Sequence, residues 1–246
     1  MCETPLLEAN RIPVCSACLS SVTPLAADYF CAACQAPFAS PFPLDENQLC
    51  GICRRGARGY DRCYSYGFYE GTLARLIQLL KYERIEPLAA VLGGLLSDSL
   101  PRDIVFDGIV PMPMHWTRRY VRGFNQAELL ARDLSRRTGI PVIEAVRRSR
   151  LTRAQVGLSD HHRRRNVSGA FAVRRSDGLE GRHVLLIDDV LTTGATAAAC
   201  AAALKKAGAA RVTVMTVARA DRRLAPSVPL GNDRPLRAQS NIAGGC

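Results

Sequence analysis

The pattern of apolar and polar positions changes near residue 64, because the first sixty residues carry cysteine, proline and glycine but almost no periodic apolar pattern. The alternation in "YSYGFY" (64–69) predicts a strand, and the spacing in "GTLARLIQLLKY" (71–82) predicts a helix. Further helices are expected at 86–100, 125–139 and 195–208, and further strands at 104–110, 141–146, 169–173, 183–188 and 211–217. This alternation predicts an α/β domain with an open parallel sheet and flanking helices.

Local signals define the ends of one helix especially well. Asn125 is a predicted N-cap with Glu128 three residues on, and Gly139 is a predicted C-terminal stop. The segment between the strand ending at 110 and this helix is expected to be an arginine-rich loop. Gly93 and Gly94 weaken the helix expected at 86–100.

The length of 246 residues suits one α/β domain with a small appendage. We expect an N-terminal domain over 1–62, an α/β domain over 63–220 and, from its proline and glycine content, a flexible tail over 221–246. No apolar stretch approaches the roughly 20 residues that span a bilayer, and no secretory signal is evident. A cytoplasmic protein without membrane insertion is therefore expected.

The formal net charge of +11 is concentrated in one segment. Residues 116–165 contain thirteen arginines and four acidic residues, a net charge of +9. Such a segment favours a polyanion as partner, either a nucleic-acid backbone or a phosphorylated small molecule. A solvated basic face is the alternative.

Ten cysteines in a cytosolic chain favour metal binding over disulfides. Six of them form three C-x-x-C pairs: Cys15/Cys18, Cys31/Cys34 and Cys50/Cys53. Two such pairs complete a tetrahedral zinc shell, and the spacings suit a structural zinc ribbon. We expect the ligands to be Cys31, Cys34, Cys50 and Cys53. The remaining pair would either replace one of these pairs or need a further partner, such as Cys2 or Cys63.

The stretch "HVLLIDDVLTTGAT" (183–196) places two carboxylates and three threonines between a buried strand and a helix. The loop "TTGAT" (192–196) offers hydroxyls, consecutive backbone amides and a glycine at a helix N-terminus, which suits a phosphate. Asp188 and Asp189 suit ribose hydroxyls or a Mg²⁺ ion. Together these groups predict a site for a ribose 5-phosphate.

This stretch closely resembles the phosphoribosyl-pyrophosphate signature of type I phosphoribosyltransferases. With "DGIVPMP" (107–113), "RRYVRGFNQAELLAR" (118–132), "RRRNVSGAF" (163–171) and the three cysteine pairs, the chain resembles the ComF/GntX family of competence-associated phosphoribosyltransferase-like proteins. The resemblance covers about residues 15–219. It implies the type I phosphoribosyltransferase fold, an open parallel sheet with flanking helices and a hood (about 141–182), preceded by a zinc ribbon.

The resemblance also implies roles for individual residues. Asp188 and Asp189 would bind the ribose hydroxyls of phosphoribosyl pyrophosphate (PRPP), with Mg²⁺ as cofactor. Its 5-phosphate would be bound by Thr192, Thr193, Gly194, Ala195 and Thr196, and its pyrophosphate by Arg118, Arg119 and Arg122. The basic segment 147–165 would lie over the site. Lys81 matches a recurrent family lysine, although a lone lysine at a helix end is more often a helix-dipole partner. No catalytic residue is assigned.

Two functions are consistent with this resemblance. The first is a Mg²⁺-dependent phosphoribosyltransferase, a glycosyltransferase whose acceptor the sequence does not reveal. The alternative is a non-catalytic sensor or scaffold that binds single-stranded DNA through its arginine-rich surface, including Arg163, Arg164 and Arg165. The family's association with competence implies a role in DNA uptake or in the use of imported DNA, with uptake proteins as further partners.

Overall fold

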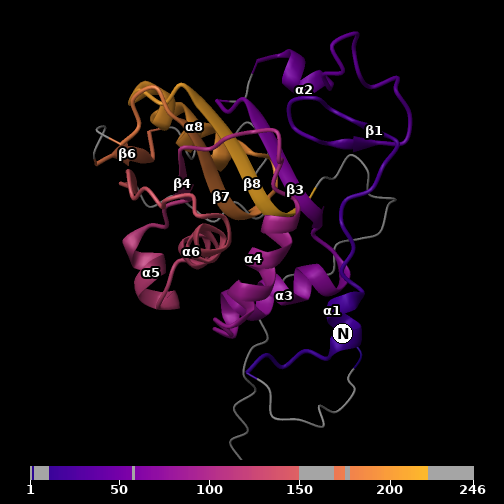
Figure 1. Ribbon diagram of the computed structural model, residues 1–246, viewed down its shortest axis with the longest axis vertical. Coiled ribbons are helices and arrows are strands. Elements are labelled where there is room, and N and C mark those ends of the chain that lie inside the picture. Colours follow the sequence, from indigo (N-terminus) through magenta and orange to yellow (C-terminus); the bar gives the residue numbers. More distant parts are fainter. Residues whose placement is uncertain (1, 3–10, 57–58, 150–168, 175–177, 221–246) are drawn as a thin grey trace, which may run out of the picture.

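The computed structural model describes residues 2, 11–56, 59–149, 169–174 and 178–220. Within them, a parallel four-stranded sheet carries helices on both faces (Figure 1). Its strands, in spatial order, are β3 (Arg62–Phe68), β8 (Arg211–Arg219), β7 (His183–Leu191) and β4 (Gly108–Pro111). Among the described residues, the last strand along the chain therefore lies inside the sheet, between β3 and β7.

Strand β7 is covered on both faces, which explains its unbroken apolar run. Val184, Leu185, Leu186 and Ile187 are all fully buried. Val184 and Leu186 pack into one core cluster, and Leu185 and Ile187 pack into the other. A strand that alternates between two buried faces needs apolar residues at every position, as parallel sheets usually do.

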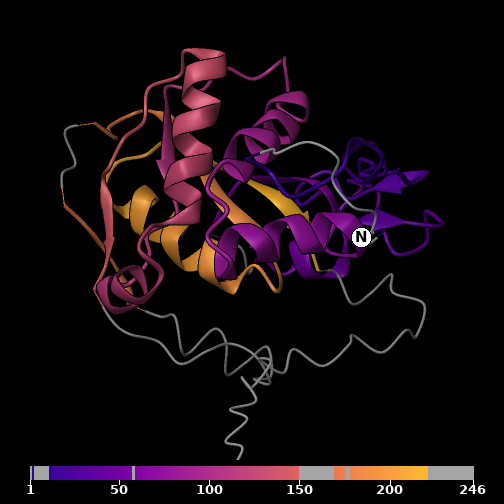
Figure 2. The ribbon, with the colours of Figure 1, turned by 90° about the horizontal axis from the view of Figure 1, so that it is seen from below.

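The helices divide between the two faces. Helices α4 (Leu88–Asp98) and α6 (Gln126–Thr138) lie on one side of the sheet, and α8 (Ala195–Lys206) lies on the other (Figure 2). Helix α3 (Gly71–Tyr82) shares the core cluster of α4 and α6. Asn125 caps α6 by accepting a hydrogen bond from the amide of Ala127, and Gly139 ends it in the left-handed conformation, so both predicted boundary signals are confirmed.

Gly93 has a packing role that its low helix propensity did not reveal. A Cβ atom at this position would collide with the side chain of Asp133 in α6. Asp133 is buried between α4 and α6 and accepts hydrogen bonds from Arg136 and Arg137 at 2.7 and 2.6 Å. The missing side chain therefore leaves room for the buried carboxylate of Asp133 between the two helices, while its arginine partners remain exposed.

Two expectations about local structure are wrong. The expected arginine-rich loop contains a helix, α5 (Trp116–Arg122), which buries none of its residues and so has no apolar face for periodicity to detect. The expected strand at 141–146 is only an isolated parallel bridge between Val142 and Ile109. The chain then turns away into β5 (Val146–Arg148), which pairs antiparallel with β6 (Phe171–Val173) to form a separate two-stranded sheet.

The cysteine-rich segment packs beside the main sheet and has little regular structure. It contains α1 (Ser16–Ser20), β1 (Tyr29–Phe30), β2 (Pro37–Phe38) and α2 (Gly51–Arg54). Most of the basic segment 147–165 and the whole 221–246 tail lie outside the described residues. Across the part of the chain that the structure describes, no helix is long and apolar enough to cross a membrane.

Candidate functional site

The two adjacent carboxylates near the end of β7 have different surroundings. Asp189 forms an ion pair with Lys81, with 2.9 Å between Oδ1 and Nζ, and both side chains are more than four-fifths buried. Lys81 comes from the last turn of α3, so two elements distant in the sequence meet here. Asp188 accepts a hydrogen bond from the backbone amide of Asp189 at 2.9 Å.

Burial and charge together shift the pKa values of this group. Burial, followed by the negative charge of Asp189, raises the pKa of Asp188 to about 7. Burial alone would lower the pKa of Lys81, but the charges of Asp189 and Asp188 outweigh it and raise that pKa. The site thus holds one firmly paired carboxylate beside one that titrates near neutrality, as is common at functional sites.

The loop of residues 192–196, called here the hydroxyl loop, connects β7 to α8. Gly194 is the N-cap of α8 and has a φ of 75°, a left-handed conformation that glycine adopts without strain. The amide of Ala195 donates to Oγ1 of Thr193 at 3.4 Å. The first-turn amides of a twelve-residue helix therefore follow the carboxylate pair after a short connection, residues 190–194, and a helix N-terminus favours an anion.

The three arginines expected at the site do not share one environment, although all lie on α5. The positive charge of Arg118 lowers the pKa of Arg148, and the charge of Asp188 acts on the same group in the opposite direction. In contrast, Arg119 pairs with Glu128 of α6 at 3.2 Å. The guanidinium of Arg122 lies 5.5 Å from the centre of the Tyr82 ring. Among these three arginines, Arg118 is thus the one that lies near Arg148, which in turn is influenced by Asp188.

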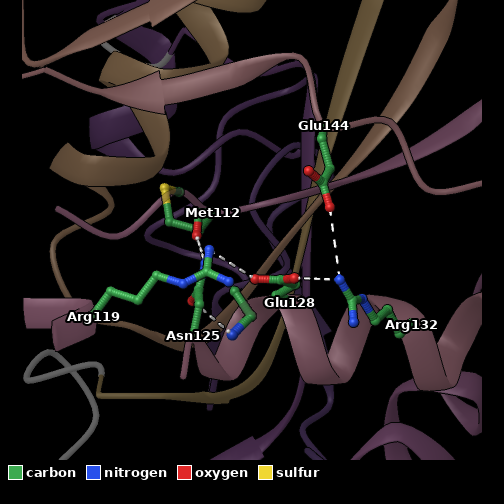
Figure 3. A network of polar contacts seen from close by, with 7 residues as sticks. Met112, Arg119, Asn125, Glu128, Arg132 and Glu144 are labelled. Carbon is green, nitrogen blue, oxygen red and sulfur yellow. Dashed lines mark hydrogen bonds and ion pairs between the residues drawn. The ribbon is translucent and has the colours of Figure 1, made fainter. Parts of the chain in front are cut away.

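A polar network fixes α5 to the start of α6 (Figure 3). Glu128 lies between Arg119 and Arg132, and Arg132 also approaches Glu144 at 3.8 Å. The side-chain amide of Asn125 donates to the carbonyl of Met112 at 3.0 Å, which anchors the segment following β4. The position of α5 beside the site is therefore set by α6.

Arg148 of β5 is a candidate site residue that the sequence did not single out. Its pKa is lowered by burial and by the charge of Arg118, while Asp188 acts in the opposite direction. Its guanidinium also lies 5.5 Å from the centre of the Phe171 ring. As one of thirteen arginines in residues 116–165, it carried no distinguishing signal.

The cysteine pairs form two separate clusters. In the four-cysteine cluster, the Sγ atoms of the expected ligands all lie within 4.8 Å of one another; its members are Cys31, Cys34, Cys50 and Cys53. A second, three-cysteine cluster consists of Cys2, Cys15 and Cys18. Cys63 belongs to neither. The partner of the Cys15/Cys18 pair, left open by the sequence, is therefore Cys2.

The donor set of the four-cysteine cluster fits a tetrahedral metal ion. The amide of Cys50 points to Sγ of Cys31 at 3.3 Å, a type of contact that stabilises a thiolate, and the sulfurs of Cys34 and Cys50 are 3.8 Å apart. Both C-x-x-C pairs face the same point from different segments. The structure thus brings the four expected cysteines together in a possible metal-binding site.

Sequence comparison agrees with this geometry. Residues 121–229 match the model of the phosphoribosyl transferase domain. Together with the parallel sheet and flanking helices, this match defines the chain as a protein with a type I phosphoribosyltransferase fold.

Known proteins similar to this chain define the family. DNA utilization protein YhgH of Salmonella typhi is 32% identical over 89% of this chain and 95% of its own length. Competence protein F of Haemophilus influenzae is 35% identical over 70% and 79%, respectively. Competence protein ComFC of Bacillus subtilis is 35% identical over 45% and 44%. The chain belongs to the ComF family.

Proposed function

We propose that this protein binds phosphoribosyl pyrophosphate with Mg²⁺ and transfers its phosphoribosyl group. The observation that carries the proposal is the carboxylate pair near the end of β7, separated by two residues from the hydroxyl loop at the N-terminus of α8. The carboxylates would accept hydrogen bonds from the two ribose hydroxyls, and the amides and threonine hydroxyls of the loop would bind the 5-phosphate. Arg118 and Arg148 would neutralise the pyrophosphate.

Each group has a defined task in this proposal. Mg²⁺ would neutralise charge on the leaving pyrophosphate. Lys81 would hold the Asp189 carboxylate in place through their ion pair, with its oxygens available to accept hydrogen bonds. Because Asp188 has its pKa raised to about 7, it would lose a proton when a ribose hydroxyl or cation binds. Buried, preorganised charges of this kind stabilise developing charge without reorganising solvent.

Calorimetry with PRPP and Mg²⁺ tests the binding step. We expect the wild-type protein to bind and the double variant Asp188→Asn/Asp189→Asn to lose at least about 100-fold in affinity, since two acceptors to the ribose are weakened. Arg182→Gln, on the chain before β7, is a control that should bind normally. Absence of binding by wild-type protein would rule out the site. Release of pyrophosphate on incubation with candidate bases would then separate an enzyme from a sensor.

For the cysteine clusters we propose zinc. Four thiolates at tetrahedral spacing, without a position left for substrate, support a structural ion in the four-cysteine cluster. Metal analysis of purified protein should find at least one zinc per chain. Cys50→Ser should abolish this tightly held zinc, whereas Cys63→Ser, outside both clusters, should retain it.

A second candidate function is binding of single-stranded DNA, consistent with the names of the similar proteins. Trp116 and Tyr120 are 71% and 87% exposed and lie one helical turn apart on α5. Tyr82 is 70% exposed under the guanidinium of Arg122. Exposed rings among arginines provide stacking platforms and phosphate contacts for single strands. A role in DNA uptake or in the use of imported DNA would fit this surface.

Titrations of single-stranded DNA at several salt concentrations test this candidate. Trp116→Ala/Tyr120→Ala should weaken binding by about 10-fold or more without changing the salt slope, since stacking carries no charge. Replacing Arg163, Arg164 and Arg165 with glutamine should instead flatten the slope. Val105→Ala, which removes an 82% exposed apolar residue of another segment, is the control. Wild-type affinity in both variants would exclude these surfaces.

A further inference from the structure

Arg219 is a buried arginine that connects the α/β domain with the cysteine-rich segment. It is the last residue of β8 and only 2% exposed. Its Nη1 atom donates to the carbonyl oxygens of Cys34 and Gln35, at 2.9 and 2.6 Å. Burying a guanidinium is unfavourable, and hydrogen bonds to carbonyl oxygens offset part of this cost, so these two bonds tie the side chain to the segment that it reaches.

The two carbonyls belong to a loop whose shape depends on the four-cysteine cluster. We call residues 31–36 the knuckle, because it carries two of the cluster's cysteines. The amide of Gln35 donates to the carbonyl of Cys31 at 2.8 Å, and Gln35 has a left-handed φ of 50°. A non-glycine residue holds this conformation only when its surroundings enforce it. Metal bound by Cys31 and Cys34 would supply that constraint, and with it the orientation of both carbonyls.

The backbone at Arg219 lies beside the end of β7, which leads into the hydroxyl loop. Arg219 lies opposite Leu191 in the β7–β8 ladder, and the amide of Ala220 donates to the carbonyl of Leu191 at 2.8 Å. Leu191 directly precedes the hydroxyl loop. On its other side, the carbonyl of Arg219 accepts from the amide of Tyr69 at 2.8 Å. One residue therefore contacts the knuckle through its side chain and the base of the loop through its backbone.

A second contact joins the same two regions. Gly59, just after the cysteine-rich segment, lies so close to α8 that a Cβ atom there would collide with the carbonyl of Ala198. Two residues on, Asp61 pairs with Lys205 of α8 at 2.7 Å. The helix that begins at the hydroxyl loop is therefore held by the exit of the cysteine-rich segment.

We propose that Arg219 is a positioning residue through which metal in the four-cysteine cluster orders the hydroxyl loop. The proposal rests on the proposed zinc site and on the loop's proposed role as the phosphate cradle. When metal is lost, the knuckle relaxes, Arg219 loses its two acceptors, and the end of β8 no longer fixes Leu191. Coupling between distant sites typically changes affinity by about 5–150-fold. We expect zinc removal to weaken PRPP binding within this range.

Hydrogen exchange on the full-length chain tests the coupling without any ligand. The proteins are wild type, Arg219→Met, Arg219→Lys and, as control, Arg211→Met, which changes an exposed arginine at the start of the same strand. In wild type and the control, chelating zinc should speed exchange of the loop amides about 10-fold or more. In Arg219→Met the loop should already exchange fast with zinc bound, and chelation should add little. Arg219→Lys, which keeps one donor group, should fall between them.

The outcomes separate this proposal from the one on which it rests. If zinc-loaded Arg219→Met keeps wild-type loop exchange, or chelation affects both proteins equally, the coupling through Arg219 is wrong. If Arg219→Met does not fold, the same comparison is made with Arg219→Lys. Calorimetry with PRPP and Mg²⁺ follows. Absence of binding by zinc-loaded wild type would refute the proposed ligand, while the exchange data would still decide the coupling.

Discussion

At the scale of single residues, the environment distinguishes side chains that the sequence presents as equal. Asp188 and Asp189 are adjacent and chemically identical, yet one titrates near neutrality and the other is paired with a lysine from another helix. The motif revealed that two carboxylates were present. Their different states depend on α3, more than a hundred residues earlier, and could not be predicted from the motif.

The raised pKa of Asp188 predicts a pH dependence of ligand binding. Its folded-state pKa of about 7 lies above the ordinary 3.8, so the site carries an extra proton below neutrality. If the carboxylate is the binding form, affinity for PRPP and Mg²⁺ should rise between about pH 6 and pH 8. Calorimetry in buffers of different ionisation enthalpy should detect proton release. Asp188→Asn should bind weakly at every pH and release no proton.

The same shift predicts the sign of a stability change. A carboxyl whose pKa is raised on folding stabilises the fold fully below its unfolded pKa, and this contribution is lost as pH rises through the folded pKa. Asp188→Asn should therefore gain stability relative to wild type between about pH 4 and pH 7, and keep that gain above pH 7. Urea unfolding at several pH values measures the difference. A constant difference across this range would contradict the raised pKa.

The ion pair between Lys81 and Asp189 predicts strong coupling in stability. Lys81→Met leaves Asp189 as an unpaired carboxylate in a buried site, which should cost about 3–5 kcal/mol. The double variant Lys81→Met/Asp189→Asn should recover much of this loss, because no uncompensated charge remains. Urea denaturation of the two single variants and the double variant completes the cycle. Additive effects would argue against a direct ion pair.

At the scale of elements, the sequence predicted a helix or strand where packing requires apolar residues at regular spacing. It did not predict elements that lack such a pattern. The four strands of the main sheet and the helices α3, α4, α6 and α8 that pack against it all had an apolar pattern, and α6 also had both boundary signals. Helix α5 was missed because it buries nothing. The strand expected at 141–146 has suitable residues, but only Val142 joins the sheet before the chain leaves for the hood.

Gly93 and Gly94 offer a matched pair of tests for helix packing. Gly93→Ala should destabilise the fold by about 1–3 kcal/mol, because its Cβ would collide with buried Asp133. Gly94→Ala should be neutral or stabilising by up to about 1 kcal/mol, since the atoms nearest to its Cβ would be those of the Arg137 guanidinium at 3.7 Å, an ordinary contact, and alanine favours a helix. In thermal unfolding, the midpoint of Gly93→Ala should lie below that of wild type, and the midpoint of Gly94→Ala should lie at or above it.

Asn125 combines a helix cap with a tertiary hydrogen bond. Asn125→Ala should cost about 1–2 kcal/mol, because it leaves both the amide of Ala127 and the carbonyl of Met112 without their partner. Asn125→Asp keeps the cap but cannot donate to Met112, so its loss should be smaller. Denaturant titration separates the two contributions. Equal losses would assign the whole effect to the contact with Met112.

At the scale of the whole molecule, the cysteine-rich segment and the α/β domain share one core. Cys34, Ala36 and Phe38 belong to the same buried cluster as Val214 of β8 and Leu204 of α8. The composition change near residue 62 revealed two kinds of sequence, but nothing in it indicated a common core. Contacts between segments so far apart in sequence depend on the complete fold.

This shared core predicts that zinc removal destabilises the protein as one unit. Scanning calorimetry of zinc-loaded protein should show one main transition, and chelation should lower its midpoint by about 2–4 °C for each kcal/mol lost. Cys63→Ser, outside both clusters, should respond to chelation as wild type does. A separate low-temperature transition that alone responds to chelation would indicate an independent domain.

The position of β8 inside the sheet also has a consequence during synthesis. The hydrogen bond between Ser65 and Thr216 joins β3 to β8 across 151 residues of chain. Until the ribosome has made residues 211–219, β3 and β7 have no common neighbour. The backbone edges that β8 will pair with therefore remain unpaired. The nascent chain thus cannot close its sheet until nearly all of the domain has been translated, and a message truncated before this strand would yield a product with exposed strand edges, suited to proteolysis or aggregation.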